Sequence, residues 1–126
     1  MNIWDSKSFR IFSWTLVAAY MGIIFYLSSL ATVHVPSPFP QFDKVLHFHL
    51  YLGLAFLVTN ALPGEHARKR FLYAFLIAAV YGISDELHQY FVPPRECSFY
   101  DWLADAAGSW VGTWLYLKSE RIWRKH

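Results

Sequence analysis

Apolar residues gather in four long stretches, and each stretch is separated from the next by a short polar segment that contains proline. The first stretch, residues 11–31, carries no charged residue and has the length that a bilayer core requires, about twenty residues. The prolines of the segments 34–42, 63–64 and 93–94 interrupt helices between the stretches. The pattern predicts an all-α integral membrane protein, a single domain (1–126) with transmembrane helices at about 11–31, 44–62, 71–92 and 101–117.

The composition supports a membrane protein over a soluble one. Hydrophobic residues make up 56% of the chain and charged residues only 16%, whereas about a quarter of the residues are charged in soluble domains. The alternative of a soluble helical core for the last three stretches is disfavoured by their hydropathy. The N-terminal apolar run is too long for a signal peptide and lacks a small-residue cleavage site, so we expect it to remain as a helix. The single cysteine, Cys97, excludes an internal disulfide, and the net charge of +2 is too small to indicate a nucleic-acid partner.

The positions of lysine and arginine predict the orientation, because these residues are enriched in cytoplasmic loops. Basic clusters precede the first stretch, separate the second from the third, and follow the fourth: Lys7 and Arg10; Arg68, Lys69 and Arg70; Lys118, Arg121, Arg124 and Lys125. The other two connections contain only Lys44 and Arg95. Four crossings with both termini in the cytoplasm satisfy all three clusters. A three-helix variant, with the fourth stretch in the interface, would place the basic C-terminal tail outside and is disfavoured.

Polar residues of the apolar stretches gather at the predicted extracytoplasmic end. They are Asp43, Lys44 and His47; Asp85, Glu86, His88 and Gln89; Arg95, Glu96 and Ser98; and Asp101 and Asp105. An ionisable side chain in hydrocarbon costs about 2.5–3.5 kcal/mol, so these residues should face one another or water. At 100° per residue, three sets share a helix face: Asp43, His47 and Tyr51; Tyr81, Asp85, His88 and Gln89; Asp101, Asp105, Gly108 and Gly112. The three faces together predict a polar pocket.

Two features refine the fourth helix. Ser98-Phe-Tyr-Asp101 has the spacing of a capping box, which predicts a helix start there. Gly108 and Gly112 continue the aspartate stripe with small residues, which allow a neighbouring helix to approach closely.

Simpler interpretations exist for the residues taken singly. Asp43 and Asp101 are also placed to stabilise helix starts, and Asp85 with Arg95 could form a structural ion pair. His49 lies about 200° from His47 around the helix, and we assign it no role. None of these interpretations explains why the polar residues of three helices converge at one end.

The sequence resembles the VanZ-like family of small bacterial membrane proteins in two blocks, DKVLHFHLYLGL (43–54) and YGISDELHQYFVPPRECSFYDWLADAAGSWVG (81–112). The matching positions are Asp43, Lys44, His47 and Tyr51 in the first block and Asp85, Glu86, Gln89, Phe91, Pro93, Arg95, Asp101, Asp105, Gly108 and Gly112 in the second. Ser28 and Ser29 fit a polar position usual near the end of the family's first helix. The commonest family form has glycine where Pro94 stands, and proline stiffens the loop that holds Arg95.

The resemblance implies a multi-pass protein of the bacterial cytoplasmic membrane, in a family whose namesake is associated with low-level teicoplanin resistance. It supplies no established reaction, so whether the protein is an enzyme stays open. Because teicoplanin carries a lipid tail, we expect the outer pocket to bind, and in an enzyme to modify, a lipid-linked or amphiphilic headgroup. A non-enzymatic accessory subunit, acting with a partner protein or as a homo-oligomer, is the second hypothesis. A carrier comes third, because four helices are few and no charge lies in mid-membrane.

Roles can be assigned to the polar residues under the first hypothesis. His47 would act as general base or nucleophile, with Asp43 or Asp85 orienting its imidazole. The candidate catalytic residues are His47, Asp85, Glu86, Asp101 and Asp105, and the candidate headgroup-binding residues are Asp43, Lys44, Tyr51, Gln89 and Arg95. Lys44 and Arg95 would hold a phosphate or carboxylate. We expect no cofactor: carboxylate ligands for a divalent metal are plentiful, but no metal motif as compact as a zinc signature occurs.

Overall fold

The computed structural model describes residues 6–29, 42–64, 66–92 and 99–125, apart from the side chain of Asp43. Within these ranges the chain forms four helices and no strand: α1 (Lys7–Ser29), α2 (Phe42–Ala61), α3 (Ala67–Tyr90) and α4 (Phe99–Trp123). The all-helical fold and the four helices predicted from the apolar stretches are confirmed. The proposed N-cap, Ser98, lies outside the described residues, but α4 begins at the next residue.

Three helices extend into the basic segments that bound their apolar stretches. α1 begins at Lys7 rather than at residue 11. α3 begins at Ala67 rather than at residue 71, and α4 continues to Trp123 rather than ending at residue 117. The added turns contain the basic residues that bound the apolar runs. Lysine and arginine are good helix formers, so they end the apolar run without ending the helix.

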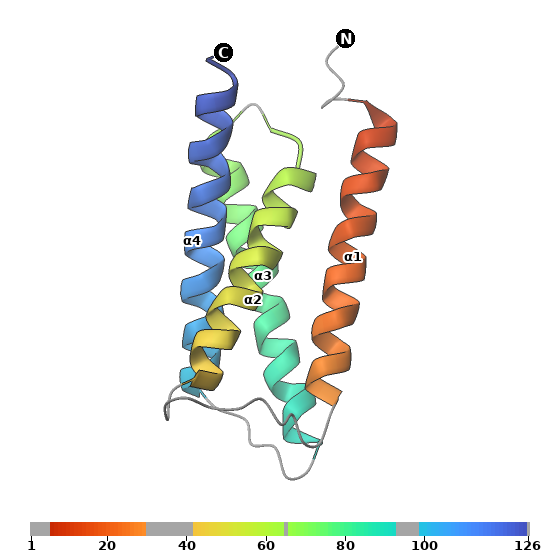
Figure 1. Ribbon diagram of the computed structural model, residues 1–126, viewed down its shortest axis with the longest axis vertical. Coiled ribbons are helices and arrows are strands. Elements are labelled where there is room, and N and C mark those ends of the chain that lie inside the picture. The colour runs from red at the N-terminus through yellow and green to blue at the C-terminus, as the bar shows by residue number, and fades with distance from the viewer. Residues whose placement is uncertain (1–5, 30–41, 65, 93–98, 126) are drawn as a thin grey trace.

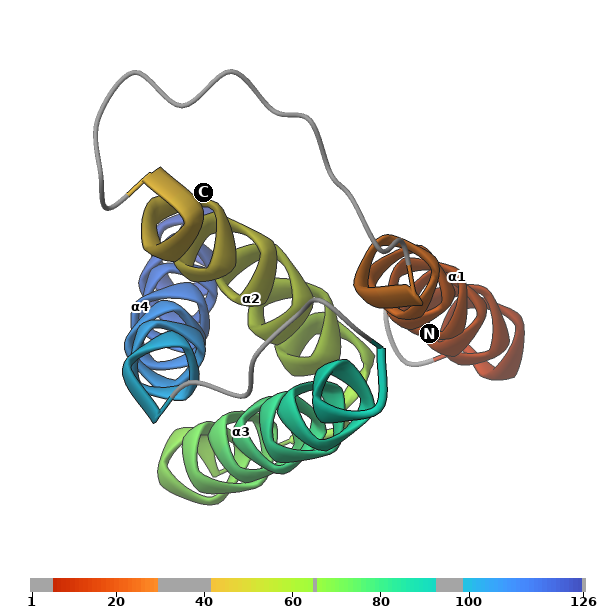
Figure 2. The ribbon, with the colours of Figure 1, turned by 90° about the horizontal axis from the view of Figure 1, so that it is seen from below.

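The helices run up and down along the long axis, so that the start of α1 and the end of α4 lie at the same end (Figure 1). Seen along this axis, α2, α3 and α4 form a three-sided group, and α1 stands beside it (Figure 2). In the described ranges α1 contacts α2 and α3 but not α4, whereas α2 and α4 share the most extensive contact.

Glycines allow α4 to pack directly on the backbone of α2. A Cβ at Gly108 would lie 2.1 Å from the carbonyl oxygen of Phe48, and one at Gly112 would lie 2.1 Å from the carbonyl oxygen of Leu52. Both positions face the partner helix, as the predicted small-residue stripe requires. The two helices are therefore in backbone contact over a full turn.

Hydrogen bonds from side chains to backbone carbonyls join the other helix pairs. Three aromatic donors reach carbonyls of neighbouring helices: Tyr20 to Leu50 (2.6 Å), Tyr81 to Met21 (2.7 Å) and Trp102 to Ala79 (3.1 Å). A polar bridge also crosses the bundle, because Asn60 donates to Ser13 (3.2 Å) and accepts a hydrogen bond from the Tyr116 hydroxyl (2.8 Å).

The outer surface of the bundle is rich in large apolar side chains, including Phe12, Phe25, Leu72, Val80 and Trp110. α1 and α3 are long and apolar enough to cross a membrane by length and composition. A surface of this kind would be unstable in water and indicates a membrane protein.

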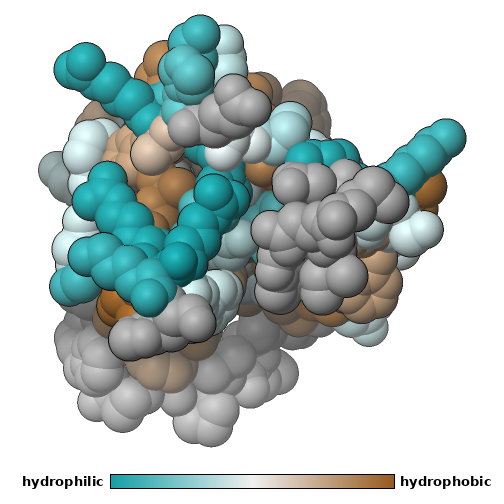
Figure 3. Space-filling view, turned by 90° about the horizontal axis from the view of Figure 1, so that it is seen from above, coloured by the Kyte–Doolittle hydropathy of each residue, from teal (hydrophilic) through white to brown (hydrophobic). Residues whose placement is uncertain are grey.

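Hydrophilic side chains gather over the end where α1 begins and α4 ends (Figure 3). Arg68 and Lys69 are exposed there, as the basic-cluster interpretation assumed, but Arg70 is buried. Its guanidinium pairs with Glu120 of α4 at 2.7 Å and donates to the carbonyl of Thr59 in α2 at 2.8 Å. Arg70 of α3 therefore binds α2 and α4 and does not add to the surface charge.

Candidate functional site

The opposite end of the bundle contains a histidine in contact with two acids from other helices. His47 lies in the second turn of α2, and its Nδ1 is hydrogen-bonded to Oδ1 of Asp105 on α4, at 2.8 Å. The same nitrogen lies 3.9 Å from Oε1 of Glu86 on α3. Asp105 has no exposed surface and Glu86 is 4% exposed, so both carboxyl groups are enclosed by the bundle.

Asp85, the neighbour of Glu86 on α3, connects α1 to the same group of residues. It is buried and accepts a hydrogen bond from the Ser28 hydroxyl near the end of α1. One ligand atom from each of His47, Asp85, Glu86 and Asp105 can be chosen so that all four lie within 4.8 Å of one another. We call these four residues the polar cluster.

Two buried polar atoms beside the cluster have no hydrogen-bond partner in the described part of the chain. They are Oδ2 of Asp105 and the hydroxyl of Tyr51, one turn further along α2 from His47. The tyrosine has no exposed surface, and it interacts electrostatically with Asp85 and Asp105 although it makes no hydrogen bond of normal geometry. Buried polar groups are normally satisfied, so these two atoms require an explanation.

Gly82 leaves the space into which Asp105 points. A Cβ at Gly82 would lie 3.2 Å from Oδ2 of Asp105 and 3.4 Å from Cε1 of Tyr51. Gly82 is not among the residues predicted for the site. Its signal was its position one turn before Asp85 on the same helix face.

Lys44 and Asp101 form an ion pair closer to the end of the bundle, with 3.3 Å between Nζ and Oδ1. Asp101 lies one turn before Asp105 on α4, and Lys44 lies nearly one turn before His47 on α2. The lysine side chain is 33% exposed and that of Asp101 10%. The pair therefore stands between the polar cluster and the outside of the bundle.

His88 contacts the end of α1 and is not part of the polar cluster. Its ring stacks on Phe25 of α1 at a centroid distance of 4.4 Å, and its Nε2 is hydrogen-bonded to the Ser29 hydroxyl at 2.8 Å. Gln89 is buried on α3, and His49 is exposed and hydrogen-bonded to the carbonyl of Val45. The side chains of Asp43 and Arg95 lie outside the described residues.

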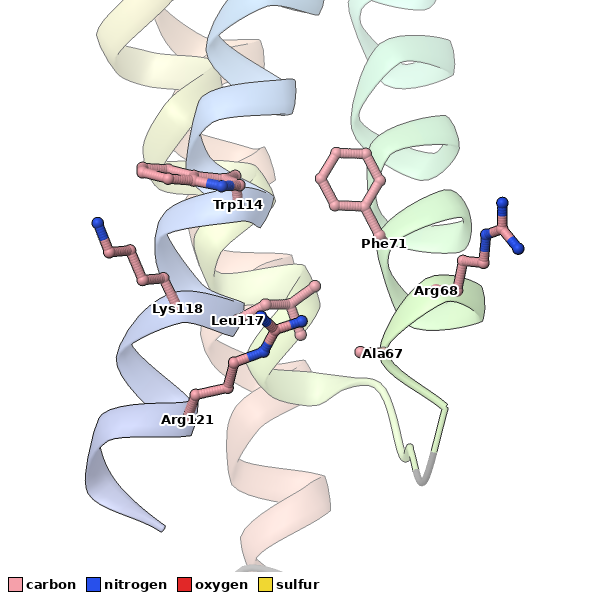
Figure 4. Close-up of a pocket in the computed structure, with 7 residues that line it drawn as sticks. All are labelled: Ala67, Arg68, Phe71, Trp114, Leu117, Lys118 and Arg121. Atoms are coloured by element: carbon pink, nitrogen blue, oxygen red, sulfur yellow. The ribbon is translucent and has the colours of Figure 1, made fainter. Parts of the chain in front are cut away.

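A cavity of about 480 Å³ lies at the other end of the bundle, between the start of α3 and the end of α4 (Figure 4). Phe71, Trp114 and Leu117 supply apolar walls. Arg68 extends away from this space, and Lys118 lies over the ring of Trp114, with Nζ 4.7 Å from the centroid. None of the candidate site residues lines this cavity.

The polar cluster can perform either of two kinds of chemistry. A histidine paired with a carboxylate can accept and return a proton, and an imidazole with three carboxylates can hold a cation. The groups come from α2, α3 and α4, and the three acids are enclosed by the bundle.

The fold and the cluster define a small helical membrane protein with buried ionisable groups near one end. The family model described as VanZ/LLP1 matches residues 2–124, which is nearly the whole chain, and the protein therefore belongs to the VanZ-like family. Comparison with curated proteins and with solved structures found no match.

Proposed function

We propose that this VanZ-like protein binds the headgroup of a lipid-linked or amphiphilic molecule at the extracytoplasmic end of the bundle. The observation that carries the proposal is the meeting of His47, Asp85, Glu86 and Asp105 within 4.8 Å. The cost of placing such groups in a membrane protein is large, and they mark functional sites by default. Lys44, paired with Asp101 beside the cluster, is placed to meet an anionic headgroup.

The proposal includes four crossings, with both termini in the cytoplasm of a bacterial cell. The gathering of exposed basic residues where α1 begins and α4 ends supports this orientation, as do the aligned helices of Figure 1. α2 contains 20 residues, so at 1.5 Å per residue it is about 30 Å long, the thickness of the hydrocarbon core. The polar cluster then lies about 8 Å inside the outer helix ends, within reach of a headgroup of the outer leaflet.

A resistance assay tests the function. The protein is produced in a teicoplanin-susceptible bacterium, and inhibitory concentrations are measured for teicoplanin and for a glycopeptide without a lipid tail. We expect the wild-type protein to raise the teicoplanin value selectively. His47→Gln should abolish this effect at normal membrane abundance, because glutamine cannot take up a proton at neutral pH.

His49→Gln is the matched control, since it makes the same change at an exposed position two residues away. It should keep full resistance. Full resistance in His47→Gln would exclude the role given to the cluster and favour the accessory-subunit hypothesis, in which the protein acts through a partner.

A further inference from the structure

The polar cluster has the ligand types and the spacing of a site for one divalent transition-metal cation. Ligand atoms that bind one cation at about 2.1 Å are about 3.0 Å apart when adjacent in an octahedron, about 3.4 Å apart in a tetrahedron and about 4.2 Å apart when opposite. The His47 nitrogen lies 2.8 Å from Asp105 and 3.9 Å from Glu86, and no chosen pair among the four residues exceeds 4.8 Å. Small side-chain adjustments would bring all four onto one ion.

An unpartnered atom of the cluster points to a missing ligand. Oδ2 of Asp105 is fully buried and has no hydrogen-bond partner in the described ranges. It packs against Gly82, since a Cβ there would lie 3.2 Å from it. An ion bound to Asp105, or a water molecule bound to such an ion, would satisfy this atom.

The charges of the cluster lead to the same conclusion. Three buried carboxyl groups meet at one half-buried imidazole. Like charges this close repel one another strongly in a site of low dielectric constant. A divalent cation would balance two of the negative charges at the point where they converge.

The ligand set also indicates the class of metal. Carboxylates suit Mn²⁺ and Mg²⁺, and imidazole suits Zn²⁺ and Fe²⁺. The four ligands found among the described residues include both types. The hydrogen bond from Ser28 to Asp85 resembles the outer contacts that orient metal-binding carboxylates. Although the sequence led us to expect no cofactor, we infer that His47, Asp85, Glu86 and Asp105 form a binding site for a single Mn²⁺ or Zn²⁺ ion. The ion would itself contact a phosphate or carboxylate of the headgroup.

Metal binding can be measured without knowledge of the substrate. The full-length protein is purified in detergent, treated with a chelator, desalted and titrated with Mn²⁺, and the free ion is followed by electron paramagnetic resonance. We expect one Mn²⁺ per chain, displaced by Zn²⁺. Asp105→Asn and His47→Gln should each weaken binding at least tenfold, because each removes a ligand.

One variant serves as the matched control. His49→Gln removes an imidazole on α2 from outside the cluster, at an exposed position. It should bind Mn²⁺ like the wild type. Circular dichroism and gel filtration establish that each variant is folded, and Glu86→Gln replaces Asp105→Asn if the latter does not fold.

Absence of stoichiometric binding of Mn²⁺ and Zn²⁺ to the wild-type protein would overturn the inference, and so would binding that is unchanged in folded cluster variants. The inference rests on the proposed function for the identity of the headgroup, but the two fail separately. If His47→Gln loses resistance but the wild-type protein binds no metal, the metal site is refuted and the proposed function is retained. If the wild-type protein binds metal but confers no resistance, the proposed function is refuted and the metal site is retained.

Discussion

Adding one methyl group at Gly108 should separate α2 from α4 and disturb the polar cluster together with the fold. The Cβ of an alanine there would lie 2.1 Å from the carbonyl oxygen of Phe48, and ordinary contact begins at 3.4 Å, so the helices must move apart by about 1.3 Å. The obstacle is backbone, which cannot rotate out of the way as a side chain can. Overpacking of this kind typically costs about 1–3 kcal/mol.

The same displacement reaches the site, because Asp105 lies nearly one turn before Gly108 on α4. Moving α4 by about 1.3 Å would lengthen the 2.8 Å contact between Asp105 and His47 to about 4 Å, beyond hydrogen-bonding distance. We therefore expect Gly108→Ala to lower both stability and function, and Gly112→Ala to lower stability by a similar amount, since its Cβ meets the carbonyl of Leu52 at the same 2.1 Å.

Thermal unfolding in detergent, followed by tryptophan fluorescence, measures the effect. Gly22→Ala is the matched control, because nothing lies within 4 Å of a Cβ at that exposed position of α1. Alanine is favoured over glycine in a helix by about 0.5–1 kcal/mol, so the control should unfold at the wild-type temperature or above it, and Gly108→Ala several degrees below. Equal stability of Gly108→Ala and the control would refute the backbone contact described here.

Three further predictions concern the rest of the bundle. Arg70→Gln should destabilise the protein by about 2 kcal/mol, because the Glu120 carboxylate then keeps only its pair with the exposed Arg124 among the described residues. Arg68→Gln should change stability by less than about 0.5 kcal/mol, and chemical denaturation in mixed micelles distinguishes the two variants. Asn60→Ala should cost about 2 kcal/mol and Tyr116→Phe about 1 kcal/mol in the same assay, since the first loses two hydrogen bonds between helices and the second loses one. A reporter active only in the cytoplasm should work at the C-terminus and be silent when inserted after Val92, and a silent C-terminal fusion would contradict the four-crossing topology.

The sequence was sufficient to predict the helices, because an apolar run between prolines has few other structures available to it. Helix ends were predicted less well. Lys118 and Arg121 end the apolar run of α4, but the backbone continues to Trp123, because hydropathy reports the surroundings of a segment and not its conformation.

The residues of the candidate site were predicted better than the side chains and helices that they contact. Helical spacing places Asp85 and His88 on one side of α3. Because α1 packs on part of that side, His88 is hydrogen-bonded to Ser29 and stacks on Phe25. A helical wheel gives the direction of a side chain but not the helix that lies there. For the same reason Arg70, one of three consecutive basic residues, could not be recognised as the buried one.

The hydrogen bonds from aromatic side chains to backbone carbonyls have a consequence for how sequences of this fold can diverge. Every residue has a carbonyl group, so the acceptor positions Leu50, Met21 and Ala79 are free to change identity without loss of the bond. The donors Tyr20, Tyr81 and Trp102 are not, since few side chains carry a hydrogen-bond donor at that reach. Evolutionary constraint between these helices should therefore be one-sided, with invariant donors facing variable acceptors, and pairwise covariation should underestimate how closely the helices are joined.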